Sequence, residues 1–206
     1  MTDFTSYKLI RKVGITDPRG NVVVEPIFDD IIIGDSIAFV KNNRRWGILT
    51  DLDNKGRIEY AYEEVMELEE VIWVRKDGNW GVLDYNGNTL IDPIYKAAWH
   101  MRDSEIVEAH DRKGAVHYVN KGLELSDEVE IMGILPFENG YAMAFGCEKG
   151  SHINKYFVVR GDDGRVLKRS FMYKHEIEEW LRDLRGSYVW SAQRQRNRFA
   201  RRKDIK

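Results

Sequence analysis

Five histidines are the first residues whose chemistry could indicate a function: His100, His110, His117, His152 and His175. His110 and His117 flank one expected turn, so their side chains could face each other across it. A metal site also needs a Cys, a further His or a carboxylate at a recognised spacing, and neither histidine has one nearby. We therefore interpret the histidines as structural or surface residues and expect no metal site.

Acidic residues are numerous, and their densest run is Glu63, Glu64, Glu67, Glu69 and Glu70. General acid–base catalysis needs two carboxylates held close together in a cleft. A chain with 34 acidic residues always offers such pairs, so the run has no catalytic specificity. We interpret it as a solvated face that could attract a basic partner.

Cys147 is the single cysteine of the chain. A cysteine nucleophile needs an activating base and donors for the oxyanion, and no known catalytic signature surrounds this residue. The sequence also contains no phosphate-binding glycine loop, no dinucleotide fingerprint and no serine-hydrolase elbow. We expect no catalytic residue and no cofactor, and therefore a protein that is not an enzyme.

The same cysteine count bears on the compartment. A lone thiol cannot form an internal disulfide, which argues against a secreted, bridged scaffold. The first residues lack the apolar stretch of a signal peptide, and no apolar run is long enough to span a bilayer. We expect a cytoplasmic protein that does not bind a membrane.

Basic residues gather at the C-terminal end of the chain. Residues 182–206 hold nine Lys or Arg and two Asp, a net charge of +7, so the rest of the chain carries −9. Such a segment could bind phosphate backbones, lie against the acidic body, pair with an acidic protein, or form a solvated helix. The candidate binding residues are Arg194, Arg196, Arg198, Arg201, Arg202 and Lys203.

The elements that must position these residues follow a repeat. Gly14, Gly47 and Gly81 lie 33 and 34 residues apart, and Trp46 and Trp80 precede two of them. A turn with glycine follows each, because glycine reaches positive φ at little cost. A third strand then ends near a proline, which has no amide hydrogen to continue the pairing. The repeat signature is Gly14, Trp46, Gly47, Trp80, Gly81, Gly87, Pro26 and Pro93.

Each copy reads as a three-stranded meander of about 34 residues. Weaker copies begin at Gly114 and Tyr156, which gives about five degenerate copies. One meander cannot bury its apolar face alone, so the copies must stack on one another. We expect the tryptophans at 46 and 80 to lie in the core between copies, because a repeated aromatic usually packs there.

These motifs resemble the WG (or KWG) repeat family of bacterial proteins, over about residues 9–168. The resemblance implies a mainly β fold of stacked β-meander or hairpin repeats, arranged as a solenoid or an open propeller-like array. It also implies a binding role without a common catalytic activity, and so a non-enzymatic scaffold for an unidentified protein partner. A nucleic-acid-associated module that uses the basic tail is the alternative.

The period changes from two to 3.6 after Leu167. Ile177, Trp180, Leu181, Leu184 and Tyr188 form an apolar stripe on one face of an expected helix that stops near Gly186. A second helix is expected over residues 187–202. We expect a domain of repeats at 1–168 and a helical and basic appendage at 169–206, whose first helix caps the array.

Overall fold

A computed structural model describes residues 5–9, 12–34, 37–50, 58–125, 128–167 and 170–187. In this part the chain forms seventeen strands in five antiparallel sheets and one helix. The mainly β fold and the C-terminal helix expected from the sequence are therefore confirmed. The basic tail, the second expected helix beyond Ser187 and the turn at Lys55 and Gly56 lie outside the described residues.

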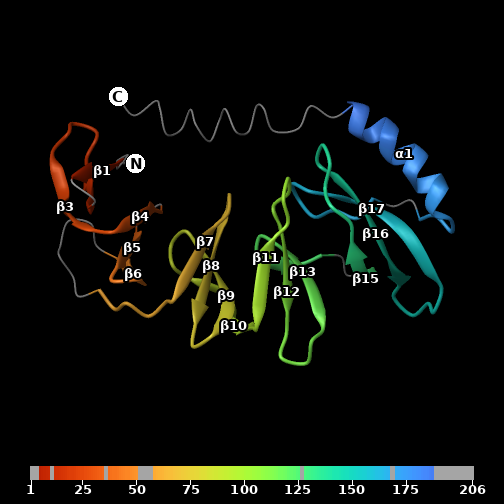
Figure 1. Cartoon of the computed structure of the whole chain (residues 1–206), viewed down its shortest axis with the longest axis horizontal. Helices are drawn as coiled ribbons and strands as arrows, with labels where there is room; N and C mark the ends of the chain where they lie inside the picture. Colours follow the sequence, from red (N-terminus) through yellow and green to blue (C-terminus); the bar gives the residue numbers. More distant parts are fainter. Residues whose placement is uncertain are drawn as a thin grey trace. The chain divides into compact units, whose positions relative to one another are not determined.

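The chain divides into two compact units, with the boundary along the sequence between Ile94 and Tyr95; Figure 1 labels the elements of both. The first unit holds three sheets, each built from strands that follow one another in the chain. Their strands are β1 (Thr5–Leu9), β2 (Lys12–Thr16) and β3 (Val22–Phe28); β4 (Asp30–Ile33), β5 (Ala38–Asn42) and β6 (Arg45–Leu49); and β7 (Glu64–Glu67), β8 (Val71–Lys76), β9 (Asn79–Asp84) and β10 (Thr89–Tyr95).

The second unit holds two further sheets and the helix (Figure 1). The fourth sheet has the order β11-β12-β13-β14 and the fifth has the order β15-β16-β17. Their elements are β11 (Ala97–His100), β12 (Ile106–His110), β13 (Val116–Asn120), β14 (Leu123–Glu124), β15 (Val129–Ile134), β16 (Tyr141–Glu148), β17 (Asn154–Arg160) and the helix α1 (Lys174–Ser187).

One turn recurs because its sequence satisfies its own backbone. The Asp84 carboxylate accepts hydrogen bonds from the amides of Asn86 and Asn88, both at 2.8 Å. Asp17 and Asp111 accept bonds from the amides two and four residues on in the same way. The glycine three residues after each aspartate has a φ between 82° and 85°. Aspartate and glycine at this spacing therefore close the hairpin locally.

The glycine of the Trp-Gly pair has a different task, because it lies on a strand. A Cβ on Gly81 would lie 2.7 Å from the carbonyl oxygen of Ile91 and 2.8 Å from the nitrogen of Pro93, both backbone atoms of β10. Glycine is required here because the next strand crosses too closely for any side chain.

The role expected for the prolines needs a correction. Pro26 and Pro93 lie within β3 and β10, and both strands continue for two residues beyond them. In the first sheet, Val13 pairs with Phe28 and Ile15 pairs with Val24, so the chain around Pro26 bulges opposite Gly14. A bulge tolerates proline because it needs no ladder hydrogen bond there.

The fourth copy was aligned wrongly at Gly114. This glycine lies in the turn between β12 and β13, with a φ of 84°, and not on a strand as Gly81 does. The third and fourth sheets use the same two turns in opposite order. A two-residue turn joins β8 to β9 and the aspartate loop joins β9 to β10, whereas the loop joins β12 to β13 and the short turn joins β13 to β14.

Apolar cores fill the spaces between successive sheets of the first unit. Phe28 and Ile15 of the first sheet pack with Ala38 and Val40 of the second. Trp46, only 5% exposed, joins residues of β5, β8 and β9 in the next core. Trp46 therefore lies in the core between two sheets, and Trp80 is also buried.

The helix α1 packs against the fifth sheet. Ile177 and Leu181 are fully buried against Met143 of β16 and Val158 of β17. At the other end of the helix, Arg185 forms an ion pair with Glu138 at 2.6 Å and donates a hydrogen bond to the Tyr141 carbonyl. The part of the expected stripe from Ile177 to Leu184 is thus the face of α1 that packs on the last sheet, and Tyr188 lies outside the described residues. None of the helices among the described residues has the length and hydropathy needed to cross a membrane.

Candidate binding groove

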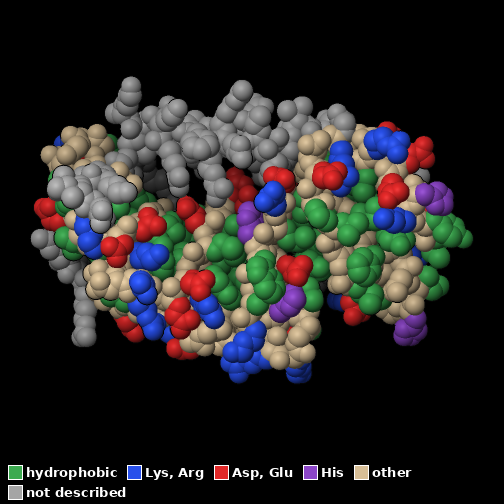
Figure 2. Space-filling view, in the orientation of Figure 1, with side chains coloured by type: hydrophobic (Ala, Val, Ile, Leu, Met, Phe, Trp, Pro, Cys, Tyr) green, Lys and Arg blue, Asp and Glu red, His purple; other side chains and the backbone are tan. Residues whose placement is uncertain are grey.

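An open groove of about 1110 Å³ lies inside the second unit. One wall comes from the β13–β14 hairpin and the residues after it, and the other from β17 and the segment that follows it. The floor is apolar, because Val129 and Phe157 belong to the core between the fourth and fifth sheets, with Leu125 and Val166 packed against them. Figure 2 shows apolar side chains of this unit reaching the surface among charged ones.

Leu123 marks the lip of the groove. It is 74% exposed, although it is a large apolar side chain at the start of β14. β14 has only two residues, whereas the corresponding β10 of the third sheet has seven. The outer strand of the fourth sheet, β14, is therefore short where it borders the groove.

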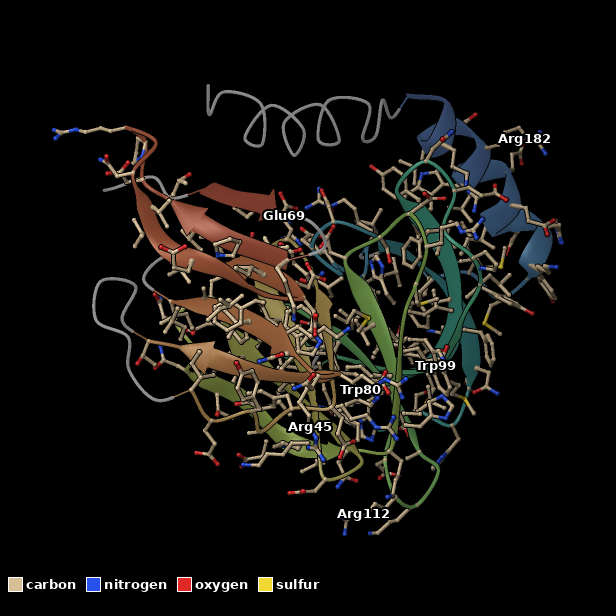
Figure 3. All side chains as sticks on the ribbon, turned by 60° about the vertical axis from the view of Figure 1, so that its left-hand side comes forward. Arg45, Glu69, Trp80, Trp99, Arg112 and Arg182 are labelled. Atoms are coloured by element: carbon tan, nitrogen blue, oxygen red, sulfur yellow. The ribbon has the colours of Figure 1, made fainter. Side chains whose placement is uncertain are left out.

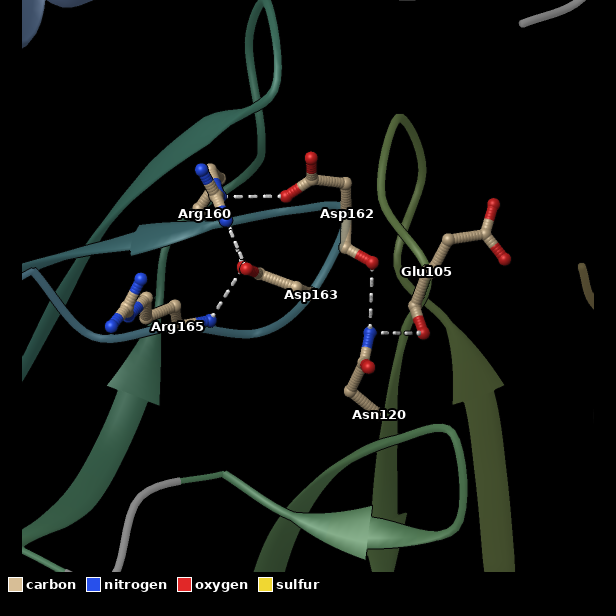
Figure 4. A network of polar contacts seen from close by, with 6 residues as sticks. All are labelled: Glu105, Asn120, Arg160, Asp162, Asp163 and Arg165. Atoms are coloured by element: carbon tan, nitrogen blue, oxygen red, sulfur yellow. Dashed lines mark hydrogen bonds and ion pairs between the residues drawn. The ribbon is translucent and has the colours of Figure 1, made fainter. Parts of the chain in front are cut away.

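A polar network holds the two sheets together beside the groove (Figure 4). The buried Asn120 of β13 donates hydrogen bonds to the Glu105 carbonyl at 3.3 Å and to the Asp162 carbonyl at 3.4 Å. The Glu105 amide in turn donates to the Gly161 carbonyl at 2.6 Å. Asn120 thus ties the turn after β17 to the fourth sheet.

Arg160 and two aspartates form the charged part of this network. The Arg160 guanidinium lies 2.9 Å from Asp162 and also forms an ion pair with Asp163. Asp163 accepts a further hydrogen bond from the Arg165 amide at 3.0 Å. The hydrogen bond that Arg160 donates to Asp163 raises the pKa of Arg160. Burial is the largest influence on the pKa of Asp163 and would raise it, but the hydrogen bonds from Arg160 and from the Arg165 amide, together with the Arg160 charge, lower that pKa.

Close packing fixes the turn at residues 161–164. A Cβ on Gly161 would lie 3.0 Å from the Cβ of Ser104 and 3.1 Å from the ring of Phe137. Gly164 has a φ of 69° and would clash with Leu125 if it carried a side chain. The wall of the groove is therefore rigid, because its turn is wedged between the two sheets.

Carboxylates along the rim have partners of their own. Glu124 accepts a hydrogen bond from His117, at 2.8 Å from Nδ1, and lies 3.5 Å from the Tyr95 hydroxyl. Burial, with Glu124 nearby, raises the pKa of Tyr95 to about 12. Glu148 forms an ion pair with Lys155 at 3.0 Å. Glu124 and Glu148 of the rim thus each have a hydrogen-bonding or ion-pair partner.

Arg165 is the exception on the rim. Its backbone takes part in the network, but its guanidinium points away from it (Figure 4). It makes no ion pair with any residue in the described ranges. An exposed cation therefore stands at the edge of an apolar floor.

The histidines do not meet as the sequence suggested. His110 pairs with Val116 and His117 pairs with Ala109, so their side chains lie on opposite faces of the fourth sheet. His110 contacts Glu108 at 2.8 Å and lies beside the exposed Trp99. Across the described ranges, no group of three metal-ligating side chains comes together.

The repeat signature lies apart from the groove. Gly14, Trp46 and Gly47 are on β2 and β6, and Trp80 and Gly81 are on β9. None of the signature residues lines the groove. Figure 3 shows how exposed charges are placed elsewhere, with Arg112 at the tip of the β12–β13 hairpin and Arg182 on α1. The basic tail residues lie outside the described part of the chain.

Sequence reasoning missed the groove residues for an identifiable reason. Asp163 and Gly164 were read as one more hairpin turn, which they are. Nothing in the local sequence shows that Asn120 bonds to a residue 42 positions further along. The usable signal in the sequence was the short turn at Lys121 and Gly122. At the corresponding place, between β9 and β10, the third sheet has a longer loop.

Two solved structures show a weak likeness to this chain. One is a chain of an S. cerevisiae complex of a dbp5 variant bound to nup159, a gle1 variant, IP6 and ADP, with 8% identity and a TM-score of 0.35. The match covers 79% of this chain and 56% of that one. The other is the N-terminal domain of Nup159, with 9% identity, a TM-score of 0.30 and coverage of 80% and 57%.

This chain therefore spans little more than half the length of either structure. No curated protein gives a significant match.

A family model described as "WG containing repeat" matches two stretches, residues 14–46 and 80–104. The first match begins on β2 and ends on β6, and the second begins on β9. Each match thus starts on the second-to-last strand of one sheet and continues into the next sheet. Residues 14–46 and 80–104 of this chain are WG-containing repeats, which confirms the family resemblance carried by Gly14, Trp46, Trp80 and Gly81.

Proposed function

We propose that this repeat protein is a non-enzymatic binding protein that uses its β-repeat surface to hold a protein partner. The observation that carries the proposal is the groove of the second unit, which combines an apolar floor with the exposed Leu123. Exposed apolar surface rimmed by polar residues is typical of interaction sites. The charged groups beside it are engaged in holding sheets together, which favours binding over catalysis.

An affinity capture with matched variants tests this proposal. The bait is the full chain, and the source is an extract of the organism that encodes it. Leu123→Asp places a charge at the lip of the groove, and Ile27→Asp places one at another exposed apolar position, on β3, 58% exposed. We expect the same proteins with the wild type and Ile27→Asp, and their loss with Leu123→Asp.

Two results would contradict the proposal. If the wild type retains nothing above a bare resin, the chain is not a protein-binding module under these conditions. If Leu123→Asp retains the same proteins as the wild type, the groove is not the binding surface.

The alternative is a nucleic-acid-associated module, which the charge of +7 over residues 182–206 favours. A gel shift at about 50 mM salt, with the full chain and a chain ending at Ser187, separates the two functions. Binding that disappears with the tail supports nucleic acid, and equal or absent binding removes that role. The cytoplasmic location and the lack of a cofactor stay predictions.

A further inference from the structure

The groove is bordered by two sheet edges whose backbone groups point away from their own sheets. The first edge is β14. Asn120 and Leu123 close a two-residue turn, and the Leu125 amide donates to the Tyr118 carbonyl at 2.8 Å. In an antiparallel ladder, alternate residues bond to the neighbouring strand. The amide and carbonyl of Glu124, which lie between these two bonded positions, therefore face away from β13.

The second edge follows β17. The Arg160 amide donates to the Arg165 carbonyl at 3.0 Å, and the Leu167 amide donates to the Val158 carbonyl at 2.8 Å. Val166 lies between these bonded positions and forms a bridge with Val159. By the same alternation, the amide and carbonyl of Val166 face away from β17. Glu124 and Val166 both line the groove.

We propose that the groove binds an extended, acidic-ended peptide segment of a partner protein, which adds as a strand to these edges. This inference rests on the proposed function. Strand addition takes its affinity from main-chain hydrogen bonds and its specificity from pockets for alternate side chains. Here the outward backbone groups of Glu124 and Val166 supply the hydrogen bonds, and the apolar floor accepts every second side chain.

The charge of the rim selects the ends of the segment. Glu124 and Glu148 already have His117 and Lys155 as partners, and Asp163 has Arg160. The Arg165 guanidinium is exposed and has no such partner in the described part of the chain. An arginine fork binds a carboxylate in bidentate geometry, so an acidic residue beside the apolar stretch suits this position.

A nucleic acid fits this groove poorly. Four carboxylates, those of Glu124, Glu128, Glu148 and Asp163, line it beside three cations. A backbone with a phosphate at every nucleotide would meet these carboxylates along the groove, whereas one acidic residue at the end of a peptide can contact Arg165 alone. The Arg160 guanidinium already forms ion pairs with Asp162 and Asp163.

The test uses a synthetic seven-residue peptide of alternating valine and threonine with a glutamate at each end. Its binding to the full chain is titrated by NMR. A second peptide replaces both glutamates by lysine, and a third carries N-methyl groups on alternate amides. We expect the lysine-ended and N-methylated peptides to bind at least tenfold more weakly. The lysine-ended peptide loses the contact with Arg165, and the N-methylated peptide loses main-chain hydrogen bonds.

Two variants with the same charge change serve as a matched pair. Arg165→Glu should weaken the glutamate-ended peptide at least tenfold and favour the lysine-ended one. Arg112→Glu, at the tip of the β12–β13 hairpin outside the groove, should change neither. Unchanged circular dichroism of both variants shows that they fold.

Equal binding of the three peptides, or no binding of the glutamate-ended peptide to the wild type, would overturn this inference. The proposed function would remain intact if either result were found while the affinity capture still retained a partner in a way that depends on Leu123. Failure of the capture itself would refute the proposed function.

Discussion

The third and fourth sheets have the same strand order but differ in their outer strands. The repeat-family match covers β9 and β10 of the third sheet and continues over β11 of the fourth, and the third sheet ends in β10, seven residues long, which crosses closely over Gly81. The fourth sheet exchanges the order of its turns and ends in β14, two residues long. The groove lies beside the sheet that departs from the pattern. The glycine of the Trp-Gly pair thus lies where a long outer strand crosses closely, and the groove lies beside the sheet whose outer strand is short.

The largest expected effect comes from replacing one glycine by alanine in each of the two sheets. Gly81→Ala should lower the free energy of unfolding by about 3 kcal/mol, because the new Cβ meets backbone of β10 that cannot move aside. Gly114→Ala has open space around it and a φ of 84°, so it should cost about 1 kcal/mol, the strain of a left-handed residue. Urea unfolding measures both, and equal costs would refute the different roles assigned to the two glycines.

The second-largest expected effect on stability concerns the hydrogen bonds of Asn120 beside the groove. Asn120→Ala should destabilise the second unit by about 2 kcal/mol, because it leaves the Glu105 and Asp162 carbonyls without their shared donor. Hydrogen exchange should show faster opening of the turn at residues 161–164. Asn139→Gly removes an exposed amide donor to the helix end at a φ of 48°, which glycine also adopts, so it is the control and should cost less. A cost below that of the control would show that Asn120 does not hold the wall of the groove.

A smaller effect should appear in the pH dependence of the recurrent turn. The hydrogen bond from the Asn88 side chain, followed by backbone amides, lowers the pKa of Asp84 from its ordinary value of 3.8. A lowered pKa means that the ionised carboxylate stabilises the fold above pH 3.8 and that this gain is lost as the pH falls through the lower folded value. Asp84→Asn should therefore be less stable than the wild type at neutral pH, and this difference should vanish in acid.

The same experiment on the fourth sheet sharpens the comparison. Backbone hydrogen bonds lower the pKa of Asp111 in the same direction. Asp111→Asn should follow the pH trend of Asp84→Asn, since the loop is the same although it joins different strands. Unfolding curves at a series of pH values check this, and opposite trends would show that the two loops are not equivalent.

The smallest effect lies in the short turns. Gly78 of the third sheet has a φ of 72°, and Arg44 occupies the corresponding turn of the second sheet with a φ of 69°. Arg44→Gly should stabilise the fold by about 0.5 kcal/mol, because relief of the left-handed strain exceeds the added entropy of the unfolded chain. Thermal unfolding measures the shift, and a loss of stability would mean that the arginine side chain contributes a contact of its own.

Much of the fold was within reach of the sequence. Asp84, Gly87 and their counterparts close hairpins through hydrogen bonds that span four residues, so the local sequence determines them. The apolar stripe of α1 was visible for the same reason, because Ile177 and Leu181 are one helical turn apart. The bulges around Pro26 were not visible, because they depend on which strand lies opposite.

The sequence by itself determined that the chain is a series of β-meanders with a helix at the end, since turn chemistry and periodicity act over a few residues. Only the tertiary structure decided where the groove lies that we propose as the binding site for a partner. The groove depends on the backbone edges of Glu124 and Val166, and on contacts such as that of Asn120 with Asp162, which join residues far apart in the chain. Packing between sheets brings these groups together, and no local pattern records it.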